Sequence, residues 1–101
     1  LRPNCELCDR DLPPDTPNAR ICSYECTYCA ECVEERLHNV CPTCGGNFTP
    51  RPIRPRNEWR AGSGLGLGYH PPSQLRRHSR WSSEDIADLV LRASVIRPEE
   101  R

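Results

Sequence analysis

The residues best suited to chemistry in this chain are eight cysteines, all of them in the first half of the sequence. They form four close pairs, namely Cys5 and Cys8, Cys22 and Cys26, Cys29 and Cys32, and Cys41 and Cys44. Each close pair lies in a turn that presents two thiolates, and two such turns complete a tetrahedral Cys₄ shell around zinc. The pattern therefore predicts two bound Zn²⁺ ions in closed sites, which are structural because a closed shell leaves no position for water or substrate.

Three other chemistries are open to the same cysteines. Four disulfides fit the count, but the close pairing and the lack of a recognisable secretion signal favour metal. A zinc-release thiol redox switch is the second, although no alternating strand and helix pattern of a redox fold surrounds any pair. Iron is the third, because the stretch Cys41-Pro-Thr-Cys-Gly45 resembles the knuckle of rubredoxins, whose single iron would leave four cysteines unexplained.

The rest of the composition explains why metal is needed. Leu, Ile, Val and Phe make up only 18 of the 101 residues, too few for a self-sufficient core. There is no lysine, which excludes mechanisms that depend on a side-chain amine. No apolar run approaches the roughly 18 residues of a membrane span, so we expect no membrane partner and a cytoplasmic location.

Charge and composition divide the chain into three parts. Residues 1–50 carry four Arg against eight acids, whereas residues 51–101 carry ten Arg against six. We expect a two-zinc module over residues 1–50, a flexible Pro/Gly/Arg-rich linker over 51–80, and an amphipathic helix over 81–97. The tail is otherwise expected to be largely disordered.

The expected helix carries both a start signal and an apolar face. Ser82 is placed to cap it, with Trp81 and Ile86 at the two positions of a hydrophobic staple. Ile86, Leu89, Val90 and Ala93 fall on one face, and Pro98 ends the pattern. Because a helix of about 14 residues is marginal alone, its face needs a partner: the zinc module, a second copy or another protein.

Spacing alone leaves open which cysteine pairs share a metal. Over residues 5–44 the order, spacing and flanking residues resemble the RING finger family, with a short hairpin over 20–28 and a short helix over 32–38. The resemblance implies a small α+β, treble-clef fold with cross-brace pairing: Cys5, Cys8, Cys29 and Cys32 bind one zinc, and Cys22, Cys26, Cys41 and Cys44 the other. The alternative is sequential, with Cys5, Cys8, Cys22 and Cys26 on one zinc and the remaining four on the second.

The apolar residues between these cysteines have matching roles. Tyr28, Val33, Leu37, Val40 and Phe48 are nearly all the apolar mass available to fill the space between two metals. In RING ubiquitin ligases, the residues that correspond to Leu7 and Pro42 bind a conjugating enzyme. Gly45, however, stands where many active ligases have a basic residue, so ligase activity is an alternative and a non-enzymatic adaptor is the expectation.

A second resemblance covers the stretch from Arg2-Pro-Asn-Cys-Glu6, through Cys8-Asp-Arg-Asp-Leu-Pro-Pro14, to Cys44. It is to a family of small bacterial proteins known as domain of unknown function 1272. This resemblance implies the same zinc-stabilised fold and indicates no activity.

The arginines of the second half suggest the remaining alternative, a nucleic-acid-binding or regulatory zinc protein that acts through its tail. Because zinc-bound thiolates make the module still more acidic, we instead expect the tail to lie on or near its own module. His38 is expected to be a surface residue, since eight thiolates already fill two sites. We expect an adaptor that binds an unidentified protein partner, and self-association through the helix is the alternative. The candidate partner-binding residues are Leu7, Pro42, Ile86, Leu89 and Val90.

Overall fold

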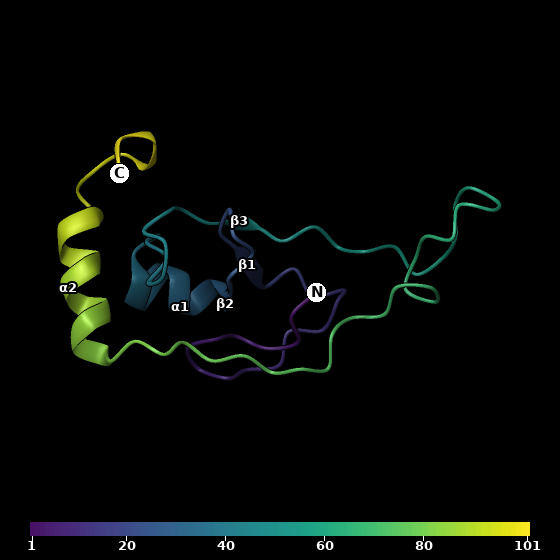
Figure 1. Cartoon of the computed structure of the whole chain (residues 1–101), viewed down its shortest axis with the longest axis horizontal. Helices are drawn as coiled ribbons and strands as arrows, with labels where there is room; N and C mark the ends of the chain where they lie inside the picture. Colours follow the sequence, from purple (N-terminus) through teal and green to yellow (C-terminus); the bar gives the residue numbers. More distant parts are fainter.

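The computed structural model describes all 101 residues, as a small α+β module followed by a long irregular segment and a second helix (Figure 1). Its elements, in chain order, are β1 (Ala19–Ile21), β2 (Thr27–Cys29), α1 (Ala30–Cys32), the π-helical turn η1 (Val33–Leu37), β3 (Thr49–Pro50), α2 (Ser83–Ala93) and the 3₁₀ turn η2 (Pro98–Glu100). No helix has the length and apolar character needed to cross a bilayer.

The sheet has three antiparallel strands in the order β2-β1-β3. Strands β1 and β2 form the hairpin that the sequence predicted, with Arg20 opposite Tyr28. Strand β3 was not predicted, because two exposed residues that include Pro50 carry no strand signal. Pro50 is accommodated because β3 is an edge strand, where a residue without an N–H group breaks no ladder.

The first helical segment follows β2 without a loop. Cys29 is its N-cap, and α1 continues directly into η1, which covers most of the helix expected over 32–38. Val33 and Leu37 are buried on its inner face. The segment ends where His38 and Asn39 adopt left-handed backbone angles, with φ of 47° and 61°.

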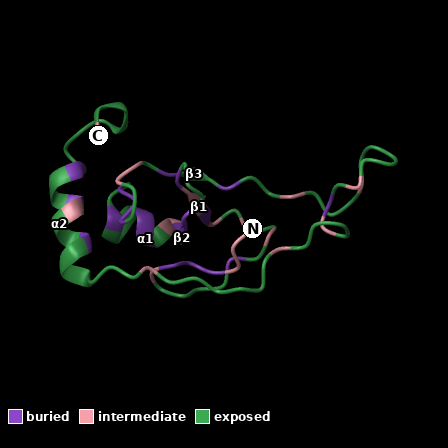
Figure 2. Ribbon diagram, in the orientation of Figure 1, coloured by how far each residue is buried: buried purple, intermediate pink, exposed green.

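One cluster of buried residues forms the core (Figure 2). It contains six of the eight cysteines and all five apolar residues expected between the metals, Tyr28, Val33, Leu37, Val40 and Phe48. The Tyr28 and Phe48 rings pack edge to face with centroids 5.4 Å apart. Leu12 and Ala19, which the sequence pattern did not single out, are also buried there.

Residues 51–80 contain no helix or strand, as the composition predicted. Part of this segment projects from the module, which gives the molecule a longest dimension of 48 Å (Figure 1). The projecting loop closes where the Leu67 N–H donates to the Pro55 carbonyl at 3.0 Å. Gly66 makes this closure possible, because it has a φ of +108° and a Cβ there would lie 2.9 Å from the Asn57 carbonyl oxygen.

Helix α2 returns to the module. The predicted cap is present: the Ser82 side chain accepts a hydrogen bond from the Asp85 N–H at 3.0 Å. The helix ends at Ala93, short of the expected residue 97, because the chain turns and the Ile96 N–H bonds back to the Ala93 carbonyl. Its apolar residues Ile86, Val90 and Ala93 belong to the same core cluster as the cysteines. This chain therefore covers the apolar face of its own helix.

Candidate metal centres

The first group of cysteine sulfurs brings together two pairs that are distant in the sequence. Cys5 and Cys8 come from the N-terminal turn, whereas Cys29 is the N-cap of α1 and Cys32 is its last residue. All four sulfurs lie within 4.8 Å of one another. Three of these cysteines are buried and Cys8 is exposed.

The spacing of these sulfurs fits a tetrahedral metal. A zinc ion with four Zn–S bonds of ~2.3 Å separates its sulfurs by about 3.8 Å, the edge of the tetrahedron. The Cys8 and Cys29 sulfurs, from different turns, are 3.8 Å apart. The group can therefore hold a metal ion without a large rearrangement of the backbone.

The second group contains the Cys22, Cys26 and Cys41 sulfurs, which also lie within 4.8 Å of one another. Cys22 and Cys26 belong to the turn between β1 and β2, and Cys41 follows η1. Members of the first and second groups alternate along the chain as pairs, so neither group is made of neighbouring pairs. A sequential arrangement would instead have placed Cys5 and Cys8 beside Cys22 and Cys26.

Cys44 is the predicted ligand that lies outside these groups. Its thiol is exposed, and its sulfur accepts a hydrogen bond from the Gly46 N–H at 3.3 Å. It nevertheless belongs to the same turn as Cys41, because the Gly45 N–H donates to the Cys41 carbonyl at 2.8 Å. The backbone of this turn therefore holds Cys44 next to a member of the second group, whereas the direction of its sulfur depends on the side-chain rotamer.

Backbone N–H groups point at cysteine sulfurs in three of the four turns. The Cys8 N–H donates to the Cys5 sulfur at 3.5 Å, the Tyr24 N–H to the Cys22 sulfur at 3.3 Å, and the Gly46 N–H to the Cys44 sulfur at 3.3 Å. Such donors stabilise negative charge on sulfur. The turns depend on left-handed residues, among them Asp9, Glu25 and Gly45, with φ of 66°, 68° and 78°.

Burial sets the protonation of the inner thiols. It raises the pKa of the Cys29 thiol to about 11, and it also raises the pKa of the Cys32 and Cys41 thiols. Burial opposes ionisation of Cys8 and Cys22 as well, but the pKa of each is lowered because N–H groups and neighbouring sulfurs donate to it. A group of buried thiols becomes a group of thiolates only with a cation among them, so both groups suit a dication.

The candidate partner-binding residues are mostly covered. Pro42 is buried, as are Ile86 and Val90, whereas Leu7 and Leu89 are partly buried and pack against the core. His38 is exposed at the end of η1 and belongs to neither sulfur group.

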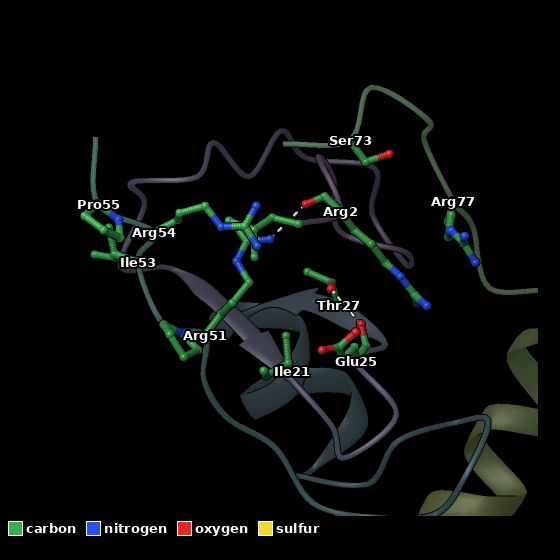
Figure 3. A pocket seen from close by; sticks show the side chains of 12 residues that line it. Arg2, Ile21, Glu25, Thr27, Arg51, Ile53, Arg54, Pro55, Ser73 and Arg77 are labelled. Atoms are coloured by element: carbon green, nitrogen blue, oxygen red, sulfur yellow. Dashed lines mark hydrogen bonds between the residues drawn. The ribbon is translucent and has the colours of Figure 1, made fainter. Parts of the chain in front are cut away.

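A cavity of about 520 Å³ lies beside the sheet, between the N-terminal segment and the irregular segment (Figure 3). Its charged lining residues are mainly basic: Arg2, Glu25, Arg51, Arg54 and Arg77. Three of the four guanidinium groups are held by the chain itself, and one of these is Arg54, which donates to the His70 carbonyl at 2.9 Å. Arg2 pairs with Glu6 at 2.7 Å, and Arg51 is buried with its guanidinium donating to backbone carbonyls.

Arg51 is a structural residue that sequence reasoning missed, because one arginine in an Arg-rich stretch carries no signal of burial. Its guanidinium donates to the carbonyl oxygens of Arg2 at 2.8 Å, Leu12 at 3.2 Å and Pro13 at 3.0 Å. Burial lowers the pKa of this guanidinium. Arg51 directly follows β3, and its side chain therefore joins the end of this strand to the N-terminal segment.

The architecture is thus that of a small α+β module with two cysteine groups that can hold metal ions. Residues 1–54 match the family described as Protein of unknown function (DUF1272), and the chain belongs to that family. A Rhizobium meliloti (strain 1021) protein, described as uncharacterized, is 62% identical over 55 residues. That match covers 54% of this chain and 66% of the relative, just under two thirds of its length. No solved structure matches this chain.

Proposed function

We propose that residues 1–50 form a RING-like module held together by two structural Zn²⁺ ions in cross-brace order. Cys5, Cys8, Cys29 and Cys32 bind the first ion, and Cys22, Cys26, Cys41 and Cys44 bind the second. The observation that carries this proposal is the interleaved grouping of sulfurs, with the Cys8 and Cys29 sulfurs separated by one tetrahedral edge. Bound zinc supplies charge neutralisation and a rigid tetrahedral junction in place of a large apolar core.

Four thiolates fill the coordination shell of each ion, which leaves no position for a substrate or an activated water. The function we propose is therefore that of a non-enzymatic adaptor, which presents a metal-stiffened surface to another protein. The acidic groups around the first turn support this role, because Asp9 and Asp11 already bind one basic segment of this chain.

Cobalt titration tests the ligand sets. Co²⁺ in an all-sulfur tetrahedral site gives intense visible absorption that changes when one sulfur is replaced by oxygen. We expect two equivalents of Co²⁺ with all-sulfur spectra, and in Cys44→Ser one of the two spectra should change. An unchanged spectrum in Cys44→Ser would show that Cys44 is not a ligand, and saturation at one equivalent would contradict the two-site proposal.

A further inference from the structure

The segment 73–81 lies along residues 4–11 of the module, far from it in sequence (Figure 1). This segment is extended and contains no helix or strand. The residues that it contacts lie in and beside the first cysteine turn. We call residues 4–11 the acidic groove, because they include Glu6, Asp9 and Asp11.

The acidic groove holds the backbone of the segment. Asn4 is fully buried, and its side-chain amide donates to the Arg77 carbonyl at 2.7 Å while its side-chain oxygen accepts from the Arg77 N–H at 3.1 Å. Two residues later, the Ser79 N–H donates to the Glu6 carbonyl at 2.7 Å. These bonds involve only main-chain atoms of the segment, as in the binding of an extended peptide along a strand edge.

Two basic side chains of the segment also contact carboxylates of the acidic groove. The Arg76 guanidinium bonds to the Asp11 carboxylate at 2.6 Å and to the Asp9 carboxylate at 3.0 Å. The His78 Nε2 lies 2.9 Å from the same Asp9 oxygen. Residues 76 and 78 lie on one side of an extended chain because side chains alternate. The acidic groove therefore contacts basic residues at two alternate positions of the segment.

All of the groove residues lie inside the part of the chain that matches the family, residues 1–54, whereas the segment that fills the groove lies outside it. The groove is consequently a property of the module, and the segment is a ligand tethered to it. The irregular chain between them, residues 55–72, contains no helix or strand that would prevent exchange.

We propose that the acidic groove is a peptide-binding site for a partner protein, and that residues 73–81 occupy it as a tethered competitor. This inference rests on the proposed adaptor function and names the partner's chemistry. The partner segment is extended, carries arginine at the position of Arg76 and a basic residue two positions later, and has no proline at the positions of Arg77 and Ser79, where N–H groups are required.

Tethering determines how the site behaves. A short flexible linker gives the attached segment an effective concentration of about 1 mM, so a free peptide must compete with it. If the attached segment and the free peptide each bind the site with an intrinsic dissociation constant of ~10 μM, the attached segment weakens the apparent affinity of the free peptide about 100-fold. Release of the segment should therefore reveal a site that the intact chain masks.

The test uses the full chain with its own segment weakened by Arg76→Glu and Ser79→Pro. Arg76→Glu replaces an ion pair with repulsion, and Ser79→Pro removes the N–H that bonds to Glu6. The probe is a synthetic peptide of residues 73–81, and its matched control is the same peptide with Ser79→Pro, which has equal charge. Binding is measured by calorimetry and by NMR shifts of the Asn4 side-chain amide, with metal content measured on the same samples.

We expect the released chain to bind the probe about 100-fold more tightly than the unaltered chain. Within the released chain, Asp11→Asn should weaken binding about threefold to fivefold, whereas Asp15→Asn, which changes charge equally, should leave it unchanged. A released chain that keeps two metals and does not bind the probe overturns the inference and leaves the metal-held module intact. Equal binding of the control peptide also overturns it, because attraction would then depend on charge alone.

If the double variant fails to retain metal, the single variant Arg76→Glu provides the same comparison. Loss of metal in the unaltered chain would instead be a failure of the proposed function. A dimer of the unaltered chain that Arg76→Glu converts to monomer would show that the groove is filled by a second copy, which contradicts a foreign peptide as its occupant.

Discussion

The indole Nε1 of Trp81 donates a hydrogen bond to the Thr43 hydroxyl at 3.2 Å, across 38 positions of the sequence. Thr43 lies between Cys41 and Cys44, and Trp81 directly precedes the cap of α2. At the other end of the helical tail, the Arg101 guanidinium donates to the Asn39 and Gly45 carbonyls at 3.0 Å and 3.2 Å. Both ends of the tail are thus attached to the turn that carries the last cysteine pair.

Metal removal is therefore expected to release the helical tail as well as to unfold the module. Structural zinc contributes on the order of 10–16 kcal/mol of apparent binding free energy, against a typical domain stability of about 5–15 kcal/mol. In the variant Trp59→Phe, which leaves Trp81 as the one tryptophan, chelation should shift the emission to longer wavelength and remove helical circular dichroism. Emission that is unaffected by chelation would show that the tail contacts do not depend on metal.

Cysteine and histidine substitutions separate ligands from neighbours. Cys29→Ala removes a buried sulfur of the first group, so this variant should lose at least one metal ion and its fixed structure. His38→Ala should keep both metals, because His38 belongs to neither sulfur group. Metal content by mass spectrometry and dispersion of the NMR spectrum check both, and a metal lost in His38→Ala would contradict the ligand assignment.

Metal affinity is expected to rise with pH. In the metal-free chain, burial raises the pKa of the Cys29 thiol to about 11, so at neutral pH this thiol is protonated and binding must displace its proton. Each displaced proton strengthens apparent affinity about tenfold per pH unit, and acidification has the opposite effect. Competition against a chelator at pH 6, 7 and 8 measures this slope. An affinity independent of pH would exclude thiolate ligands.

Docking of α2 depends on its buried face. Val90→Asp places a carboxylate in the core cluster and should destabilise the docked helix by about 2–4 kcal/mol, which increases hydrogen exchange of the α2 amides. Leu91→Asp is the matched control, because Leu91 is 75% exposed on the opposite face. Metal content should be unchanged in both variants. Equal exchange in the two would mean that the helix is not held through Val90.

Arg51 provides a test of the module's polar interior. Arg51→Leu leaves the carbonyls of Arg2, Leu12 and Pro13 without this donor. The Leu12 carbonyl is the buried one, and an unpaired buried group costs about 1–3 kcal/mol. We expect a lower free energy of unfolding, measured by denaturant titration at fixed zinc concentration. Arg56→Leu removes an exposed guanidinium and should change stability little.

Local patterns predicted the features that depend on nearby residues. The cap at Ser82, the apolar face of α2 and the buried residues Tyr28 and Phe48 followed from spacing and composition. The RING resemblance implied the interleaved sulfur groups, which residue spacing alone could not distinguish from a sequential order. The acidity of the module likewise indicated that the arginine-rich tail lies on it, as Arg76 does with Asp9 and Asp11.

Features that depend on distant backbone atoms were not predictable. The partners of Asn4 and Arg51 are main-chain groups, which every residue carries and which therefore leave no mark in the sequence. Strand β3 is recognised only by its pairing with β1, and α2 ends at Ala93 because the chain turns back on itself. The position of the Cys44 sulfur is set by a side-chain rotation that spacing does not specify.

Native mass spectrometry of the purified full chain, before and after chelation, tests the central claim most directly when combined with a count of free thiols after denaturation. The account predicts two zinc ions before chelation, none after it, and eight reduced cysteines. One iron, four disulfides or a folded chain without metal would contradict it.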